Sequence, residues 1–511
     1  MFTELISFEH IMGKEAYILR VVESMQATVD KLSEEVLIAI NREEMILKEE
    51  AFNTHIFNAC LMGIDFVYIN VCISALAALK TDNVHAKRYH WKNVVAGISE
   101  GIKYIYSFKE SEKKTLIGYL TTILNDSGMV TPEISDSLSV LQDLLEKFRA
   151  DWDGKVMRDI VLHYDKSAGK LIKETMAITD EEPYASLLSC YLLIMNILHA
   201  ICTIGYLQSL IENDLGLSDV NLDETGLLGN DGRHMKAIQA LLKGKKFKVS
   251  TEKYLNEYGK RFLDSIALFE KIQKGYEFLG IKKGEKSSNG QLEKFYQLNN
   301  LYSLVMYSML DILSITDSYL SSDTEFEAAL NMRYFLIVKT SALTQIVGYT
   351  EEEARESLWY EMKQLLPESD VPLHDMADKL ESCLKESVQD QNVRMVRAKL
   401  VHLKFSKKKP GDVKGILSIL NTFDPLTEFY KVIDLIELLI KVIKFLDRLI
   451  VSIDKEVTIE NQKFLDKIRS MSSSLRDMIE RNVKDKAQKE EMLTSINANE
   501  FKIIDLLKKR L

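Results

Sequence analysis

The sequence predicts an all-α protein, and three of its features support this fold class. Only six Pro and 22 Gly occur in 511 residues, so few positions interrupt regular structure. Leu, Ile, Lys and Glu dominate the composition, which favours long helices. Alternating β-branched runs between turn residues, the usual sign of strands, are scarce. A chain of this length can build about two to four domains.

Hydrophobic periodicity divides the chain into five predicted segments. Residues 1–50 hold an N-terminal helix, with apolar positions at Leu19, Val22 and Met25 in helical spacing. Residues 51–212 form a first helical bundle and residues 291–454 a second. Between them, 213–290 combine Gly-, Asp- and Lys-rich linkers with a helical insert, which takes the place in the second bundle that the N-terminal helix has in the first. Residues 455–511 form a charged, amphipathic tail, predicted to be a helical hairpin.

A short pattern occurs once in each bundle. Arg158 and His163 are separated by four residues, and so are Arg397 and His402. With nine His and sixteen Arg in the chain, chance would give roughly 0.3 such pairs. The residues around the two pairs also align without a gap. This repetition predicts two copies of one domain.

The alignment of the two copies extends to other positions. Asp65 pairs with Asp311, each inside an apolar helix, and Arg88 pairs with Arg333. Because a buried carboxylate needs a partner, we interpret Asp65 and Asp311 as partners of these arginines.

Two His and two Arg suit RNA cleavage without a metal ion. One imidazole can deprotonate the 2′-hydroxyl, which attacks the adjacent phosphorus, and the other can protonate the leaving oxygen. Guanidinium groups can stabilise the charge on the phosphorane. On a helix, Arg and His five residues apart lie about 7.5 Å apart along the axis and could line both edges of a groove. If the bundles pack face to face, Arg158, His163, Arg397 and His402 meet in one cleft.

The pattern at 157–165, Met-Arg-Asp-Ile-Val-Leu-His-Tyr-Asp, resembles the signature of the HEPN superfamily. The resemblance implies all-helical domains, endoribonuclease activity from a composite site, and a role in antiviral defence or a toxin system. Asp159 fits the polar residue that often follows the Arg and is expected to support catalysis. Ala398 and Leu403 depart from the pattern, so the second copy is expected to be weaker. The duplicated bundles cover about two thirds of the chain.

The charge distribution predicts where RNA would bind. A net charge of −10 argues against a generally cationic RNA-coating protein. A local basic run starts two residues after His402, however, and it contains the predicted substrate-binding residues Lys404, Lys407 and Lys408.

Other features of the sequence point to a cytoplasmic protein without cofactors. The start of the chain lacks the basic and apolar regions of a signal peptide, and the five cysteines form no CxxC pair. Asp219 to Asp223 imitates the start of an EF-hand, but Glu224 replaces the required Gly, so no metal site is predicted. Besides RNA, expected partners are a regulatory protein or antitoxin and a second copy of the chain bound through the C-terminal helices.

Two alternatives remain open. The HEPN-like bundles could have lost catalysis and act as a scaffold or sensor through protein–protein contacts. A membrane-associated protein is supported only by the uncharged stretch 186–207. The corresponding stretch of the second bundle carries Asp434, Glu437, Lys441 and Lys444, so we predict a helix buried on most sides and no membrane contact.

Overall fold

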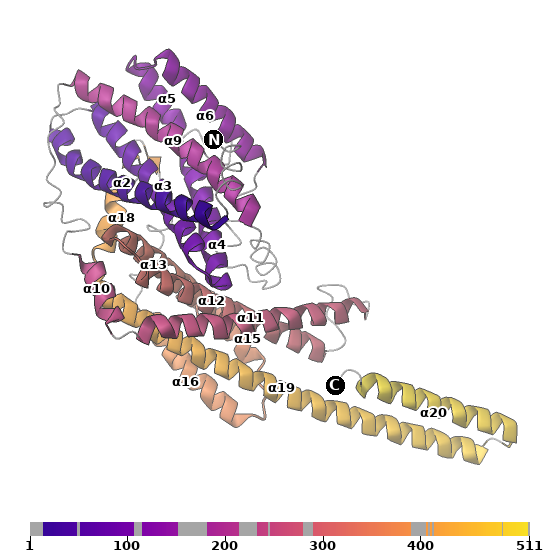
Figure 1. Ribbon diagram of the computed structural model, residues 1–511. Helices are drawn as coiled ribbons and strands as arrows, with labels where there is room; N and C mark the ends of the chain where they lie inside the picture. The colour runs from indigo at the N-terminus through magenta and orange to yellow at the C-terminus, as the bar shows by residue number, and fades with distance from the viewer. Residues whose placement is uncertain are drawn as a thin grey trace.

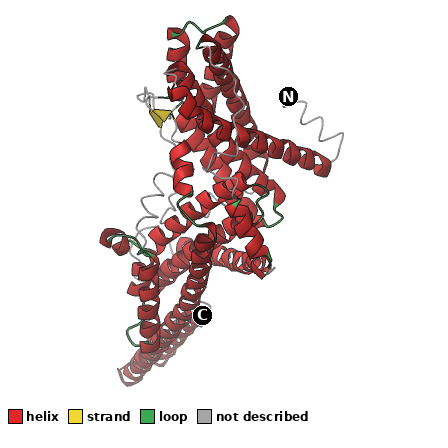
Figure 2. Cartoon of the chain, turned by 90° about the vertical axis from the view of Figure 1, so that its left-hand side faces the viewer, coloured by secondary structure: helices red, strands yellow, loops and turns green. Residues whose placement is uncertain are grey.

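The computed structural model is almost entirely helical, which confirms the all-α fold class (Figures 1 and 2). It describes residues 14–48, 52–106, 115–151, 181–213, 232–243, 246–278, 290–389, 405–406, 409–410, 413–482 and 484–508. Within these ranges the only strands are two residues each, β1 (Phe405–Ser406) and β2 (Lys409–Pro410), paired antiparallel.

The helices fall into a first and a second half along the chain. Those of the first half are α2 (Lys14–Lys48), α3 (Phe52–Lys80), α4 (Val84–Ile105), α5 (Leu116–Asp126), α6 (Pro132–Asp151) and α9 (Glu181–Glu212). Those of the second half are α10 (Arg233–Leu242), α11 (Lys246–Phe278), α12 (Gly290–Leu320), α13 (Glu325–Ile346), α14 (Glu351–Arg355), α15 (Leu358–Gln364), α16 (Val371–Ser387), α18 (Val413–Leu420), α19 (Pro425–Asn482) and α20 (Lys486–Lys508).

The two halves pack their helices in the same order. In the first, α3 contacts α2, α4 and α9, and α6 lies against α9. In the second, α12 contacts α11, α13 and α19, and α16 lies against α19. Thus α11 packs on α12 as α2 packs on α3 (Figure 1).

The hydrophobic core consists of two clusters, and each takes residues from the other half. The first is built mainly from α2, α3, α4 and α9 but includes Leu330 and Leu336 of α13. The second is built mainly from α11, α12, α13, α16 and α19 but includes Ala86 and Tyr89 of α4. Because burial of apolar surface is the main stabilising term, this exchange fixes the halves against each other.

The chain between α16 and α19 returns to the first half. β2 contacts α3, and α18 packs between α3 and α13. Val413 and Leu417 of α18 are fully buried in the first cluster. Lys414 of α18 also lies 3.7 Å from the carboxylate of Glu43 in α2.

The end of the chain forms a helical hairpin, as predicted. α19 crosses residue 454 without a break, its last core residue being Ile453, and α20 packs back against it (Figure 1).

Polar side chains fix where several helices begin. Asn83 accepts hydrogen bonds from two backbone N–H groups at the start of α4, and Thr324 accepts one at the start of α13. Thr350 and Glu353 form a reciprocal capping box on α14. These contacts satisfy N–H groups that have no partner within the helix.

We expect Gly348→Ala to lower the free energy of unfolding by about 2 kcal/mol or more. Gly348 ends α13 with φ +79°, a conformation that costs an L-residue about 1–2 kcal/mol. An added Cβ would also overlap the backbone of Glu353 and Ala354. The matched control is Gly128→Ala, since Gly128 has φ +69° but nothing within 4 Å of the added Cβ. Equal losses for both variants in urea unfolding would contradict the steric part of this prediction.

Candidate functional site

The sequence-predicted site residues all lie outside the residues that the structure describes. The residues concerned are Arg158, Asp159, His163, Arg397, His402, Lys404, Lys407 and Lys408.

The described elements around the motifs do follow one order. The first motif comes after α6 and before α9, and the second comes after α16 and before α19. α6 packs on α9 and α16 packs on α19. In the sequence, each motif therefore lies between two helices that contact each other. The elements that follow the second motif, β2 and α18, pack on α3 of the first half.

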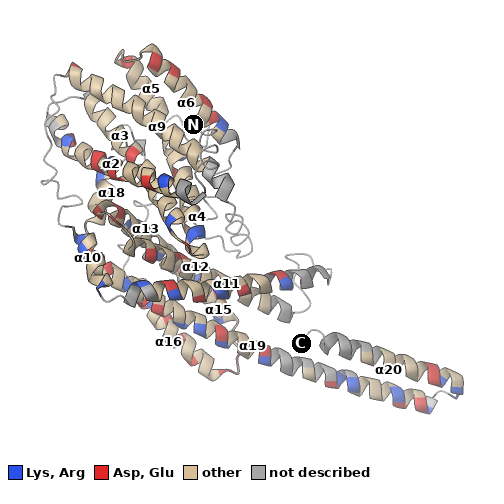
Figure 3. Ribbon diagram, in the orientation of Figure 1, with Lys and Arg blue, Asp and Glu red and all other residues tan. Residues whose placement is uncertain are grey.

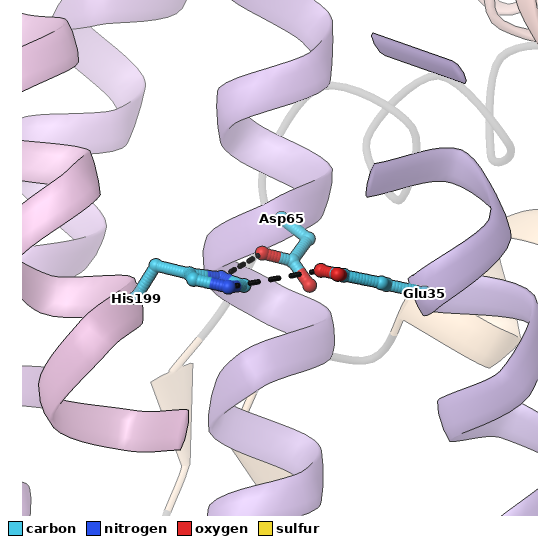
Figure 4. Close-up of side chains that lie close together, drawn as sticks. All are labelled: Glu35, Asp65 and His199. Atoms are coloured by element: carbon cyan, nitrogen blue, oxygen red, sulfur yellow. Dashed lines mark hydrogen bonds and ion pairs between the residues drawn. The ribbon is translucent and has the colours of Figure 1, made fainter. Parts of the chain in front are cut away.

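Within the described residues, three titratable side chains from separate helices meet beside the first core. Nδ1 of His199 on α9 lies 2.8 Å from a carboxylate oxygen of Asp65 on α3. Its Nε2 lies 3.7 Å from a carboxylate oxygen of Glu35 on α2. Figure 4 shows the imidazole of His199 facing both carboxylates, with a dashed line to each. Asp65 is buried, whereas Glu35 and His199 are partly exposed, so the cluster reaches the surface.

The charges in this cluster favour a protonated imidazole. Burial acts to lower the pKa of His199, but the hydrogen bond to Asp65 and the charges of Asp65 and Glu35 outweigh it. The pKa of His199 is therefore raised above its ordinary value of 6.5. Burial raises the pKa of Asp65, and the hydrogen bond to His199 opposes that rise. An imidazolium bridging two carboxylates explains the geometry.

The same donors could hold a divalent metal ion, because one His nitrogen and two carboxylate oxygens lie within 4.8 Å of one another. Nitrogen and oxygen ligands of this kind suit zinc, manganese or ferrous iron. A metal ion would need neutral His199, however, and the surrounding charges favour its proton. We therefore interpret the cluster as an ion bridge between α2, α3 and α9.

The stability conferred by His199 is expected to depend on pH. A group whose pKa is raised on folding stabilises the folded state fully below its unfolded pKa, which is about 6.5 for histidine. This stabilisation is lost as the pH rises through the folded pKa. The raised pKa of Asp65 likewise makes the folded state less stable as the pH rises. His199→Gln should cost about 1.5–3 kcal/mol at acidic pH and less at alkaline pH. Urea unfolding at about pH 6 and about pH 9 measures the difference.

His374→Gln is the matched control, since the His374 ring contacts a neutral carbonyl, that of Pro367, at 3.0 Å. It should destabilise the protein less than His199→Gln at acidic pH, because it removes a hydrogen bond to a neutral group. If the His199 variant lost the same stability at both pH values, the imidazolium bridge would be refuted.

A second charged cluster joins the two halves. Lys92 of α4 pairs with Asp311 of α12, and both side chains are at most 5% exposed. Nζ of Lys92 lies 3.1 Å from the hydroxyl of Tyr307 and 4.6 Å from the centre of its ring. Burial lowers the pKa of Lys92, and Asp311 opposes that shift. The pair is sealed from solvent and has no access to a substrate, so its role is structural.

The partners we assigned to the two buried aspartates from the sequence are therefore wrong. Asp65 pairs with His199 and Asp311 with Lys92. Arg333 instead donates a 2.6 Å hydrogen bond to the side-chain oxygen of Asn70 in α3 and lies over the Phe66 ring. The two aspartates were correctly placed in apolar helices, but a single sequence does not show which helix faces which.

Residues 186–207 are helical, as predicted, but a smaller share of this helix is fully buried than we expected. Within the part of the chain that the structure describes, two helical segments are long and apolar enough to cross a membrane, Asn53–Lys80 and Leu187–Glu212. The apolar window of the first is fully buried, whereas only 39% of the second is. Among the described helices, α9 packs on α3, α4 and α6, and apolar side chains of its remaining face, such as Ile204 and Ile211, are exposed.

His199 and Lys92 were missed because each looks ordinary in the sequence. His199 is the one titratable side chain other than Cys and Tyr between 187 and 211. An ionisable group isolated in so apolar a stretch usually has a partner, and that signal could have singled it out.

Comparison with known proteins identifies no relative: no protein-family model, curated protein or solved structure matches this chain.

Proposed function

We propose that this protein is an endoribonuclease that needs no metal ion and is built from two HEPN-like bundles. The observation that carries the proposal is the repeated Arg-x4-His motif, Arg158 with His163 and Arg397 with His402. Histidine can exchange protons near neutral pH, and arginine can stabilise a phosphorane. The motif residues would supply both chemistries at one phosphodiester.

The packing of the described helices supports a duplication. In both halves, helices that follow one another in the same order form the same packed pairs. In the sequence, each motif lies between two helices that contact each other. The exchange of core residues between α4 and α13 is reciprocal, as expected for two copies related by a pseudo-twofold axis. Such an axis would bring equivalent segments of the copies toward each other.

The proposed cellular role rests on the resemblance to the HEPN superfamily alone. A nuclease that acts in antiviral defence or in a toxin system would have to be restrained. This requires a regulatory protein or an antitoxin. The cytoplasm is where such an enzyme would meet its RNA.

Purified protein incubated with structured and single-stranded RNAs in the presence of EDTA tests the proposal. The expected products end in 2′,3′-cyclic phosphate, because the 2′-hydroxyl is the attacking group. RNA with 2′-O-methyl groups should resist cleavage. If no RNA is cleaved and expression is harmless to cells, the alternative of a scaffold without catalysis replaces the enzyme; the departures at Ala398 and Leu403 favour that alternative.

A further inference from the structure

The uncovered face of α9 carries an apolar stripe with the spacing of a coiled coil. Its members are separated by four, three, four, three and four residues, which keeps them on one side of a helix. They are Leu193, Ile197, Ala200, Ile204, Leu207 and Ile211. We call this stripe the α9 seam.

The α9 seam is exposed to solvent along most of its length. Leu193, Ile204 and Leu207 are 41–44% exposed and Ile211 is 80% exposed. Large apolar side chains at consecutive positions of one face are unusual on the surface of a monomer and mark interaction sites.

α19 provides a comparison within the same chain, because it packs on α12 and α16 as α9 packs on α3 and α6. Its exposed face follows the same spacing with five charged residues, Asp434, Glu437, Lys441, Lys444 and Arg448. Figure 3 shows charged residues along α19, whereas the middle of α9 is uncharged. A helix face that is exposed to water at this place in the fold can therefore carry charged residues, as α19 does. The α9 seam carries none.

We infer that the α9 seam is the interface between two copies of this chain, paired antiparallel about a twofold axis. Such pairing places Leu193 opposite Ile211, Ile197 opposite Leu207, and Ala200 opposite Ile204 of the other copy. Every pair is apolar, and the smallest residue meets a larger one beside the axis. The stripe is therefore complementary to itself, which a twofold interface requires.

Two further features favour the antiparallel arrangement. It places exposed Glu212 level with Leu192 of the other copy, whereas parallel helices would bring the two Glu212 side chains together. Ile211 also lines a pocket with Gly128 and Met129 at the turn between α5 and α6. That pocket can accept Leu193 of the other copy.

The length of the seam sets the expected strength of association. From Leu193 to Ile211 it spans about 27 Å, less than the three to four heptads of a self-sufficient coiled coil. We expect a dissociation constant on the order of 10 μM. This interface is separate from the C-terminal hairpin and does not depend on the proposed ribonuclease activity.

Analytical ultracentrifugation of the full chain over a range of concentrations tests the inference. Wild-type protein should dimerise, and Ile204→Glu should weaken the dimer at least a hundredfold, because each copy would bury a charge against Ala200 of the other. Val451→Glu is the matched control, since Val451 is a 54% exposed apolar residue on α19, and it should dimerise normally. Circular dichroism should show the same fold for all three proteins.

A mixing experiment tests the direction of pairing. Ala200→Lys and Ile204→Glu proteins should each dimerise poorly, but together they should form a heterodimer with one Lys–Glu pair and one native Ala–Ile pair. Parallel helices would not place these residues together. A wild-type monomer up to about 100 μM, a dimer unaffected by Ile204→Glu, or a monomer that uses this face to bind neutral phospholipid vesicles would each overturn the inference.

Discussion

Replacing His163 or His402 with alanine is expected to lower the rate of RNA cleavage by roughly 10²–10⁴-fold, the usual contribution of a general acid or base. One imidazole would remove the proton of the 2′-hydroxyl and the other would protonate the leaving oxygen. Because both act on one phosphodiester, the double variant should be little slower than the worse single variant. Single-turnover cleavage of a labelled RNA measures these rates.

RNA binding should change much less than cleavage in these variants, since neither imidazole need be charged to hold the backbone. The matched control is His374→Ala, because His374 lies on α16 and its ring forms a hydrogen bond with the backbone carbonyl of Pro367. It should cleave at the wild-type rate. Full activity in both His163→Ala and His402→Ala would remove these residues from the catalytic machinery.

Lys92→Met is expected to lower the free energy of unfolding by about 3–5 kcal/mol. The methionine fills a similar volume but leaves the carboxylate of Asp311 buried without its cation. The loss arises mainly from the cost of keeping the Asp311 carboxylate buried without the lysine that faces it. For a chain of this length, thermal unfolding followed by circular dichroism should show a decrease in Tm of roughly 3–5 °C.

The double variant Lys92→Met/Asp311→Leu separates charge from packing. Removing both charges should recover most of the lost stability, because an apolar pair of similar volume avoids the cost of desolvation. The matched control is Arg469→Met, whose partner Asp466 is 61% exposed; we expect a change within about 0.5 kcal/mol. A Lys92→Met protein as stable as wild type would show that the pair does not hold the halves together.

The sequence predicted the helical architecture because composition and periodicity are local properties. The hairpin at the end of the chain follows from apolar residues at helical spacing. The burial of Asp65 and Asp311 also followed from their apolar surroundings.

The pairing of distant residues could not be predicted in this way. Asp65 meets a residue 134 positions away and Asp311 one 219 positions away, and nothing in a single sequence connects them. The exposed face of α9 was missed for a related reason: an uncharged helix is equally consistent with burial in a core and with an interface. The catalytic role of the two Arg-x4-His motifs remains a prediction from the sequence.

The continuity of α19 makes it a spacer of defined length. After Pro425 it contains neither Gly nor Pro, so nothing in its sequence introduces a kink. The part beyond Ile453 extends about 40 Å from the body before the chain turns back into α20. A macromolecule held at the tip of the hairpin would stand at that fixed reach from the helical body.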